Sequence, residues 1–361
     1  MAAPALLSLS LRDFRNHRAT RLETGGAAAI LLTGPNGAGK TAVLEALSLL
    51  AVGKGLRASG LSELACTGGA GGFAVRAALL AEAGLPPVAI ETSADPAAPE
   101  RRRLLVESAP APLARLSEWL SVVWLTPAMD RLFADGASAR RRFLDRLTLA
   151  LHPGHARHAT RYEAAMRQRN RLLAGEGAPD PAWMDALERE MGVHGEAVAL
   201  ARADLVARLN GELVAAKDAG FPQPVLAIEA PPSDLAARLA AARAGDRAAG
   251  RTLVGPHRAD LDVRFGADGR PAALASTGEQ KALLVSILLA HARLVAEVRG
   301  RPPLLLLDEA AAHLDEGRRG LLWTRLGALG GQLWVTGTDA GLFDGLEAAR
   351  FRVLDGMVTK G

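Results

Sequence analysis

Residues 34–41 have the types and the spacing of a loop that binds phosphate groups. In order they are Gly34, Pro35, Asn36, Gly37, Ala38, Gly39, Lys40 and Thr41. They fill every fixed position of the pattern G-x-x-x-x-G-K-[ST], in which the glycines let the backbone pass close to an anion. The N–H groups at the start of the next helix then point at the phosphates. We expect Lys40 to contact the β- and γ-phosphates of a nucleotide and the Thr41 hydroxyl to coordinate Mg²⁺.

The segments on either side of this loop predict the elements that position it. An apolar run, 27–32, precedes the loop, and a second apolar segment, 42–47, follows it. A strand, a glycine loop and a helix start are therefore expected in that order, which is the context that the motif requires. The alternative is a glycine-rich turn that contains a lysine by chance, and the filled motif and its flanks disfavour it.

Two neighbouring carboxylates could complete the chemistry. Asp308 and Glu309 follow four consecutive leucines, 304–307, which predict a buried strand. Ligands bind beyond the carboxyl ends of the strands in open parallel sheets. We expect Asp308 to hold Mg²⁺ through water and Glu309 to act as the base that polarises the water attacking the γ-phosphate. The alternative is a strand that merely ends in a polar turn.

A second helix start with anion-binding character lies upstream of that strand. Its residues are Ser276, Thr277, Gly278, Glu279 and Gln280, and a long apolar segment, 282–298, follows them. Ser276 is a suitable N-cap, but one nucleotide cannot easily use two helix starts. We therefore expect this segment of a second copy to contact the γ-phosphate, which gives a head-to-tail dimer with twofold symmetry. His313 and Asp315 are expected at the seam of that dimer.

Composition excludes several classes of protein. With 361 residues, 49% hydrophobic and 23% charged, the chain is long enough for two globular domains. The single cysteine, Cys66, excludes an intramolecular disulfide and a cysteine metal cluster, which fits a reducing cytoplasm. No apolar run approaches ~18 residues, so we expect a cytoplasmic protein that has no membrane segment. The net charge of +4 is only weak support for an anionic partner.

Arginines are concentrated in the segment 140–171, which holds nine of them against two acidic residues. A solvated helix face usually mixes signs, so this excess favours contact with DNA. The candidates are Arg141, Arg142 and Arg146. The alternative places the arginines of this segment in ion pairs between helices, with Glu188, Glu190 and Glu196. Arg57, in a short turn after the first helix, is expected either to contact phosphate or DNA or to be a solvated surface residue.

The patterning also predicts how the chain is divided. Short apolar stretches between 72 and 106 predict an antiparallel sheet attached to the nucleotide lobe. Helical periodicity dominates after Gly136, and strand character returns at 251–270. We expect a discontinuous lobe formed by 1–125 and 251–361, with a mainly helical lobe, 126–250, inserted into it.

The order of these motifs resembles the ABC-type ATPases and, within them, the RecF family of bacterial recombination mediators. The resemblance covers nearly the whole chain and rests on the segments 11–16, 34–41, 53–57, 127–145, 255–258, 276–281 and 307–315. Gly255-Pro256-His257-Arg258 in combination with the segment 276–281 is typical of RecF-like chains and not of transporters. The resemblance implies an α/β ABC-type ATPase head, with a mixed sheet flanked by helices and an antiparallel β subdomain, plus the inserted helical lobe.

The resemblance also implies a function and its partners. It implies that ATP, bound with Mg²⁺ by the loop and by Arg12, induces a homodimer that binds duplex DNA and gap junctions. It further implies a nucleoid-associated mediator that acts with RecO and RecR to place RecA on DNA in repair, replication and the SOS response. No glutamine precedes Gln168, and Thr338 and Asp339 stand where a histidine is usual, which predicts slow, DNA-dependent hydrolysis that switches the dimer. The alternative is the nucleotide-binding subunit of an ABC transporter.

Overall fold

The structure is a computed structural model that describes residues 3–82, 84–175, 177, 179–216, 220–231, 233–312 and 314–361. It divides into two compact units. Unit 1 consists of Met1–Arg131, Asp218–Pro222 and Ser276–Gly361, and unit 2 of Leu132–Lys217 and Gln223–Ala275. None of the helices in the described ranges combines the length and the apolar character that a membrane crossing needs.

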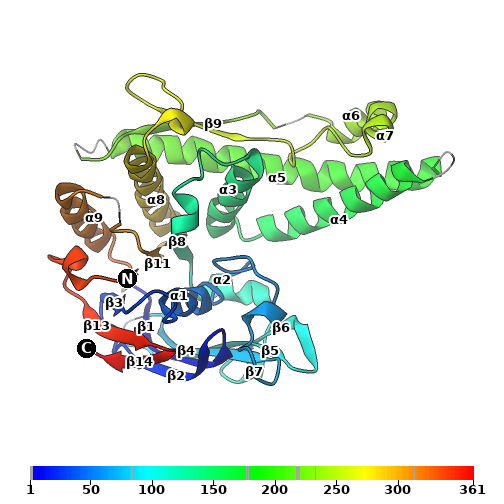
Figure 1. Cartoon of the computed structure of the whole chain (residues 1–361). Helices are drawn as coiled ribbons and strands as arrows, with labels where there is room; N and C mark the ends of the chain where they lie inside the picture. Colours follow the sequence, from blue (N-terminus) through cyan, green and yellow to red (C-terminus); the bar gives the residue numbers. More distant parts are fainter. Residues whose placement is uncertain are drawn as a thin grey trace. The chain divides into compact units, whose positions relative to one another are not determined.

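A six-stranded, mostly parallel sheet forms the centre of unit 1 (Figure 1). Its strands, in spatial order, are β14 (Met357–Lys360), β13 (Ala349–Leu354), β3 (Ala29–Thr33), β12 (Leu333–Gly337), β11 (Leu304–Asp308) and β8 (Val122–Leu125). All neighbours are parallel except β13 and β14. β11 and β12 are buried along their whole length, and each begins with a continuous apolar run, 304–307 and 333–335.

The second sheet of unit 1 is antiparallel, as the stretch 72–106 predicts. Its spatial order is β2 (His17–Glu23), β1 (Ala5–Phe14), β4 (Phe73–Leu80), β5 (Val88–Asp95), β6 (Ala98–Val106) and β7 (Ala109–Pro110). One hydrophobic core joins this sheet to α1 (Lys40–Ser48) and to the central sheet, and it includes Phe14, Leu44 and Trp334. The phosphate loop is therefore fixed between two sheets.

The remaining elements of unit 1 are helical. They are η1 (Ser62–Leu64), η2 (Leu113–Arg115), α2 (Leu116–Trp119), η3 (Pro127–Met129), α8 (Thr277–Arg299), α9 (Glu316–Ala328) and η5 (Ala340–Phe343). α8 is buried along most of its length, which explains its apolar sequence, but Ser276 and Thr277 at its start are exposed.

Unit 2 is mainly helical, with one small sheet. Its helices are α3 (Ala137–Leu151), α4 (His155–Ala174), α5 (Pro181–Ala215), α6 (Leu235–Ala241), α7 (Arg243–Ala249) and η4 (Ala272–Leu274). β9 (Pro224–Ile228) pairs with β10 (Leu261–Phe265) in antiparallel fashion. α4 and α5 lie side by side (Figure 1), and Tyr162, Met191 and Leu235 belong to the core that they share with α6.

An ion-pair network is buried in this unit. Arg169, which is fully buried, donates from Nε to Glu188 at 3.0 Å and from Nη1 to Asp246 at 2.6 Å. Arg243 also contacts Glu188. For Arg169, one of the nine clustered arginines, the structure therefore confirms the alternative of an ion pair between helices.

Two features differ from the expectations. Glycine disfavours helix interiors, yet α5 runs for 35 residues through Gly192 and Gly195 without a break. A Cβ at Gly195 would lie 2.5 Å from Leu235 Cδ2, so this glycine allows α6 to approach closely, and the packing offsets its low helix propensity.

The second difference concerns the segment 251–275, which is expected in the nucleotide lobe. It belongs to unit 2, because β10 pairs with β9.

Candidate nucleotide site

The phosphate loop connects β3 to α1, as the motif predicts. Gly39 caps α1 with a φ of 114°, and a Cβ there would lie 2.6 Å from His17 Nε2. A Cβ at Gly34 would lie 2.1 Å from the carbonyl oxygen of Val353. Both glycines are therefore required by the close approach of neighbouring chain segments.

Lys40 is folded back over its own loop. Its side chain is almost fully buried, and Nζ donates to the carbonyl oxygens of Gly34 at 2.7 Å and Pro35 at 2.9 Å. Burial lowers the pKa of Lys40, although the nearby carboxylates of Glu309 and Asp308 oppose this shift. A phosphate bound in the loop would supply the negative charge that this partly desolvated ammonium lacks.

Thr41 and Asp308 come together from α1 and β11. Thr41 Oγ1 lies 3.0 Å from both carboxylate oxygens of Asp308. Thr336 Oγ1, at the end of β12, donates to Asp308 Oδ1 at 2.7 Å. Hydroxyl and carboxylate oxygens are the ligands that Mg²⁺ prefers, and the pair Thr41 and Asp308 could hold it together with phosphate oxygens and water. The sequence around Thr336 shows only that it follows a short apolar run, 333–335, and assigns it no role.

The backbone of Glu309 is held from two sides. Its φ is 50°, in the left-handed region that a glutamate rarely adopts. Its N–H donates to Thr336 Oγ1 at 3.1 Å, and its carbonyl oxygen accepts from Lys281 Nζ at 3.3 Å. Lys281, on α8, is buried and also lies 3.3 Å from Asp130 Oδ2. The sequence gives no reason to choose Lys281 as a site residue beyond its place in the segment 276–281.

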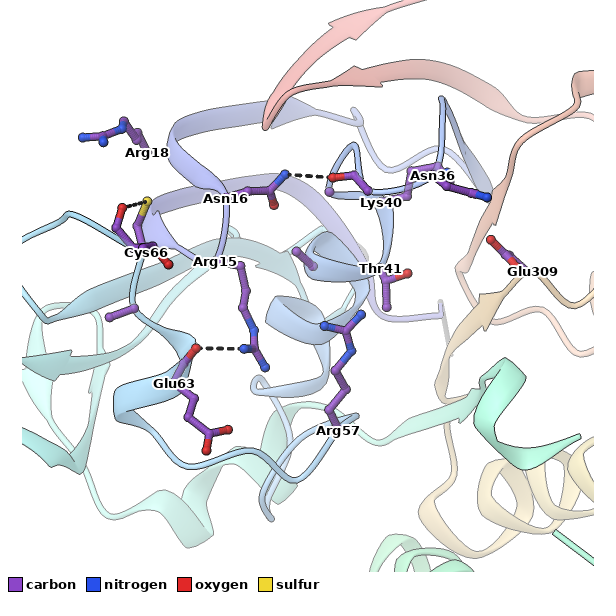
Figure 2. Close-up of a pocket in the computed structure, with 15 residues that line it drawn as sticks. Arg15, Asn16, Arg18, Asn36, Lys40, Thr41, Arg57, Glu63, Cys66 and Glu309 are labelled. Carbon is purple, nitrogen blue, oxygen red and sulfur yellow. Dashed lines mark hydrogen bonds between the residues drawn. The ribbon is translucent and has the colours of Figure 1, made fainter. Parts of the chain in front are cut away.

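A buried carboxylate contacts two arginines beside the phosphate loop. Glu45, on α1, accepts from Arg15 Nε and Nη2 at 2.8 Å each, and these bonds raise the pKa of Arg15. Arg57 Nη1 lies 3.7 Å from the same carboxylate. Figure 2 shows the Arg57 side chain pointing toward Thr41, and Arg15, Arg57 and Thr41 all line one cavity.

These residues surround a cavity of about 590 Å³ (Figure 2), a typical size for a small-molecule site. Its cationic lining residues are Arg15, Arg18, Lys40 and Arg57, and its acidic ones are Glu63 and Glu309. The excess of positive charge suits a polyphosphate. Arg12 does not line the cavity and is exposed on β1, whereas Arg15, Asn16 and Arg18 from the following turn and strand do line it.

The start of α8 has the expected cap but lies outside this cavity lining. Ser276 Oγ accepts from Glu279 N at 3.4 Å, and Ser276 N donates to Glu279 Oε2 at 2.8 Å, a capping box. Neither Thr277, Gly278 nor Gln280 lines the cavity. Asp315 is an exposed N-cap of α9 that accepts from Arg318 N. His313 lies outside the described residues.

The three candidate DNA contacts in α3 differ in their surroundings. Arg142 is exposed and donates to Ser138 Oγ at 3.0 Å. Arg141 donates from Nη1 to the carbonyl oxygen of Ala259 at 3.2 Å. The guanidinium carbon of Arg146 lies 5.0 Å from the ring centre of Phe143, and burial lowers the pKa of Arg146. Arg142 is thus the most accessible of the three.

Comparison with solved structures identifies the fold. The chain matches a RecF structure with ATP at a TM-score of 0.84 and 22% identity, covering 99% of this chain and 98% of that one. It matches an Smc head domain from Pyrococcus furiosus at a TM-score of 0.56 and 16% identity, covering 99% and 95%. A family model described as an AAA domain matches residues 8–70. The fold is therefore an α/β ATPase head of the ABC type.

Sequence comparison then identifies the family. The chain is 48% identical to the DNA replication and repair protein RecF of Mesorhizobium japonicum, covering 96% of this chain and 95% of the relative. It is 45% identical to RecF of Rhizobium johnstonii, covering 98% of both. The chain belongs to the RecF family. This membership supports ATP binding and removes the transporter alternative.

Proposed function

We propose that this chain is an ATP-dependent recombination mediator, two copies of which dimerise around ATP and bind DNA. The observation that supports this best is that two anion-binding helix starts lie apart in unit 1. The loop 34–41 and Glu309 border one cavity, whereas Ser276 and Gly278 lie outside its lining. A second copy that places the start of α8 over this cavity would complete the site, and twofold symmetry would create two such sites.

Each residue of the site would have a separate task in hydrolysis. Lys40 and the N–H groups of the loop would bind the phosphates. Mg²⁺, when held by Thr41 and Asp308, would neutralise charge on the phosphate oxygens. Glu309 would accept a proton from the water that attacks the γ-phosphorus, while the bond from that phosphorus to the bridging β-phosphate oxygen breaks. The products are ADP and inorganic phosphate.

Hydrolysis is expected to be slow and to depend on DNA. The chain has no glutamine before Gln168, so the side chain that usually senses the γ-phosphate is missing. Thr338 and Asp339 occupy the place of the usual histidine. ATP would then act mainly as a switch, because the dimer persists while ATP is bound and separates after hydrolysis.

DNA is the expected partner of the ATP-bound dimer. Family membership supports this, since the relatives are named DNA replication and repair proteins, and the solved RecF–ATP structure is described as a recombination mediator of the RecFOR pathway. We infer binding to duplex DNA and to junctions of single- and double-stranded DNA. The dimer would act there with RecO and RecR and so promote the loading of RecA.

Binding of a fluorescent gapped duplex with ATPγS, with ADP and without nucleotide tests this function. We expect roughly tenfold tighter binding with ATPγS, a typical size for coupling between two sites. Lys40→Ala should remain at the nucleotide-free affinity, whereas Lys54→Ala, which removes an exposed lysine outside the cavity lining, should behave as wild type. Equal affinity of the wild type in all three conditions would contradict the proposal.

A further inference from the structure

The segment 255–260, here called the Gly-Pro-His-Arg loop, is fixed in unit 2 by contacts that the proposed function does not use. The carbonyl oxygen of Pro256 accepts from Arg202 Nη1 at 2.6 Å. Arg202 is itself buried and donates to both carboxylate oxygens of Asp145, at 2.8 and 2.9 Å. The middle of the loop is therefore attached to α5 and, through Asp145, to α3.

His257 and Gly255 attach the same loop to α4. His257 Nε2 lies 3.0 Å from the carbonyl oxygen of Thr252, which can only accept, so Nε2 carries a proton. Nδ1 then accepts from the Tyr162 hydroxyl at 2.7 Å. Gly255 has a φ of 132°, and a Cβ there would lie 2.2 Å from Tyr162 Oη. Burial lowers the pKa of His257, which keeps the ring in this neutral state.

The end of the loop is held by α3. Arg140 forms a bidentate pair with Asp260, at 2.8 and 2.7 Å. Arg141 Nη1 donates to the carbonyl oxygen of Ala259 at 3.2 Å. The loop between these anchors also contains a turn, in which Arg258 N donates to the carbonyl oxygen of Gly255. A well-anchored backbone thus carries Arg258.

The Arg258 side chain is the exception among these contacts. It is exposed, and it has no hydrogen-bond or ion-pair partner among the described residues. The guanidinium groups of Arg141 and Arg258 are near enough to repel each other, and this repulsion adds to the burial that lowers the pKa of Arg141. The nearby carboxylates are already engaged, Asp145 by Arg202 and Asp260 by Arg140. Positive charge is left without a counter-charge at this surface.

We propose that Arg258, supported by Arg141, binds the phosphodiester backbone of DNA. This site rests on the proposed function, because it adds a contact residue for the same partner. A guanidinium presents its donors in a fixed fork that matches phosphate oxygens, and Arg141 has further N–H groups besides the one given to Ala259. Because the backbone of the loop is already ordered, binding restricts only the side chain of Arg258 and no further backbone. Because Arg258 would contact phosphate and no base, it would strengthen binding to DNA of any sequence equally.

The test uses the full chain with saturating ATPγS and a fluorescent duplex, titrated at several salt concentrations. We compare Arg258→Gln with Arg189→Gln, which removes an exposed arginine of α5 from the same unit. Arg189 lies 13 residues from Arg202 along α5, roughly 20 Å at the helical rise per residue. We also compare Arg258→Lys, which keeps the charge but loses the fork. Thermal unfolding of each variant confirms that it is folded.

We expect Arg258→Gln to weaken binding on the order of tenfold and to reduce the slope of log affinity against log salt by about one. Arg258→Lys should recover part of the affinity, and Arg189→Gln should match wild type. Arg141→Gln combined with Arg258→Gln should cost less than the two single effects together, because both side chains bind one phosphate region. If wild type binds DNA and Arg258→Gln has an unchanged slope, this site is overturned while the proposed function stands. If wild type does not bind DNA, both are overturned.

Discussion

The ammonium group of Lys281 lies 3.3 Å from the backbone carbonyl oxygen of Glu309. This contact connects α8, whose exposed start is Ser276 and Thr277, to the backbone of Glu309, the residue after β11. A displacement of α8 would therefore act directly on Glu309, the residue expected to activate water. In the proposed dimer, Lys281 would therefore link the helix start that contacts the second copy's nucleotide to the backbone of Glu309.

Replacing Lys281 by Met tests this route. The variant keeps the approximate volume of the side chain but removes the donor to Glu309 and the partner of Asp130, so Glu309 should lose one of the two contacts that hold its backbone. We expect the ATP turnover rate to fall about tenfold, which corresponds to about 1.4 kcal/mol of transition-state stabilisation. Nucleotide affinity, measured by calorimetry, should change little, because Lys281 does not line the cavity. Equal losses of turnover and affinity would contradict a positioning role.

Glu45 gives a second prediction. Its buried carboxylate binds Arg15 at two atoms and lies 3.7 Å from Arg57, so Glu45→Gln should release both guanidinium groups from their present positions. We expect ATP to bind about tenfold more weakly, a loss typical of charge-assisted hydrogen bonds. Glu23→Gln removes an exposed carboxylate that pairs with Arg21 and serves as the matched control. Wild-type affinity in the Glu45 variant would show that these arginines do not contact nucleotide.

Arg169 gives a prediction for stability. Arg169→Met leaves Glu188 and Asp246 buried, and Asp246 loses its ion-pair partner. We expect the free energy of unfolding of unit 2 to fall by about 3–5 kcal/mol, the usual cost of breaking a buried pair. Arg167→Met breaks only the exposed pair with Glu163 and should cost less than about 1 kcal/mol. Urea unfolding of the full chain by circular dichroism measures both, and similar values for the two variants would contradict the prediction.

The sequence predicted the phosphate loop, the strand before Asp308 and the cap at Ser276, because each is a local pattern. It could not reveal Thr336, because β12 enters the sheet between β3 and β11 only through tertiary pairing. The sequence resemblance implies Arg12 as an ATP-binding residue, whereas Arg15 lines the cavity, and this difference has a local cause. Asp13 and Arg15 both have positive φ, which breaks the regular alternation of a strand and changes which side chains face the cavity.

The extent of the inserted lobe has a similar explanation. Strand character at 251–270 is visible in the sequence, but strand propensity does not reveal the partner strand. β10 pairs with β9, so this segment stays with unit 2 up to Ala275.

The surroundings of the arginines in 140–171 also depend on tertiary packing. Arg169 is buried in an ion-pair network, whereas Arg142 is exposed, and charge counting cannot separate them.

In the proposed dimer, two copies of the chain share each ATP. Light scattering of the Glu309→Gln variant with and without ATP and Mg²⁺ tests it most directly, because this variant should bind ATP without hydrolysing it. We predict twice the monomer mass with ATP and the monomer mass without it. Adding Ser276→Arg to the variant should restore the monomer in ATP, since a bulky cation would replace the small cap at the shared site. A Glu309→Gln protein that binds ATP but remains a monomer at every concentration would contradict the claim.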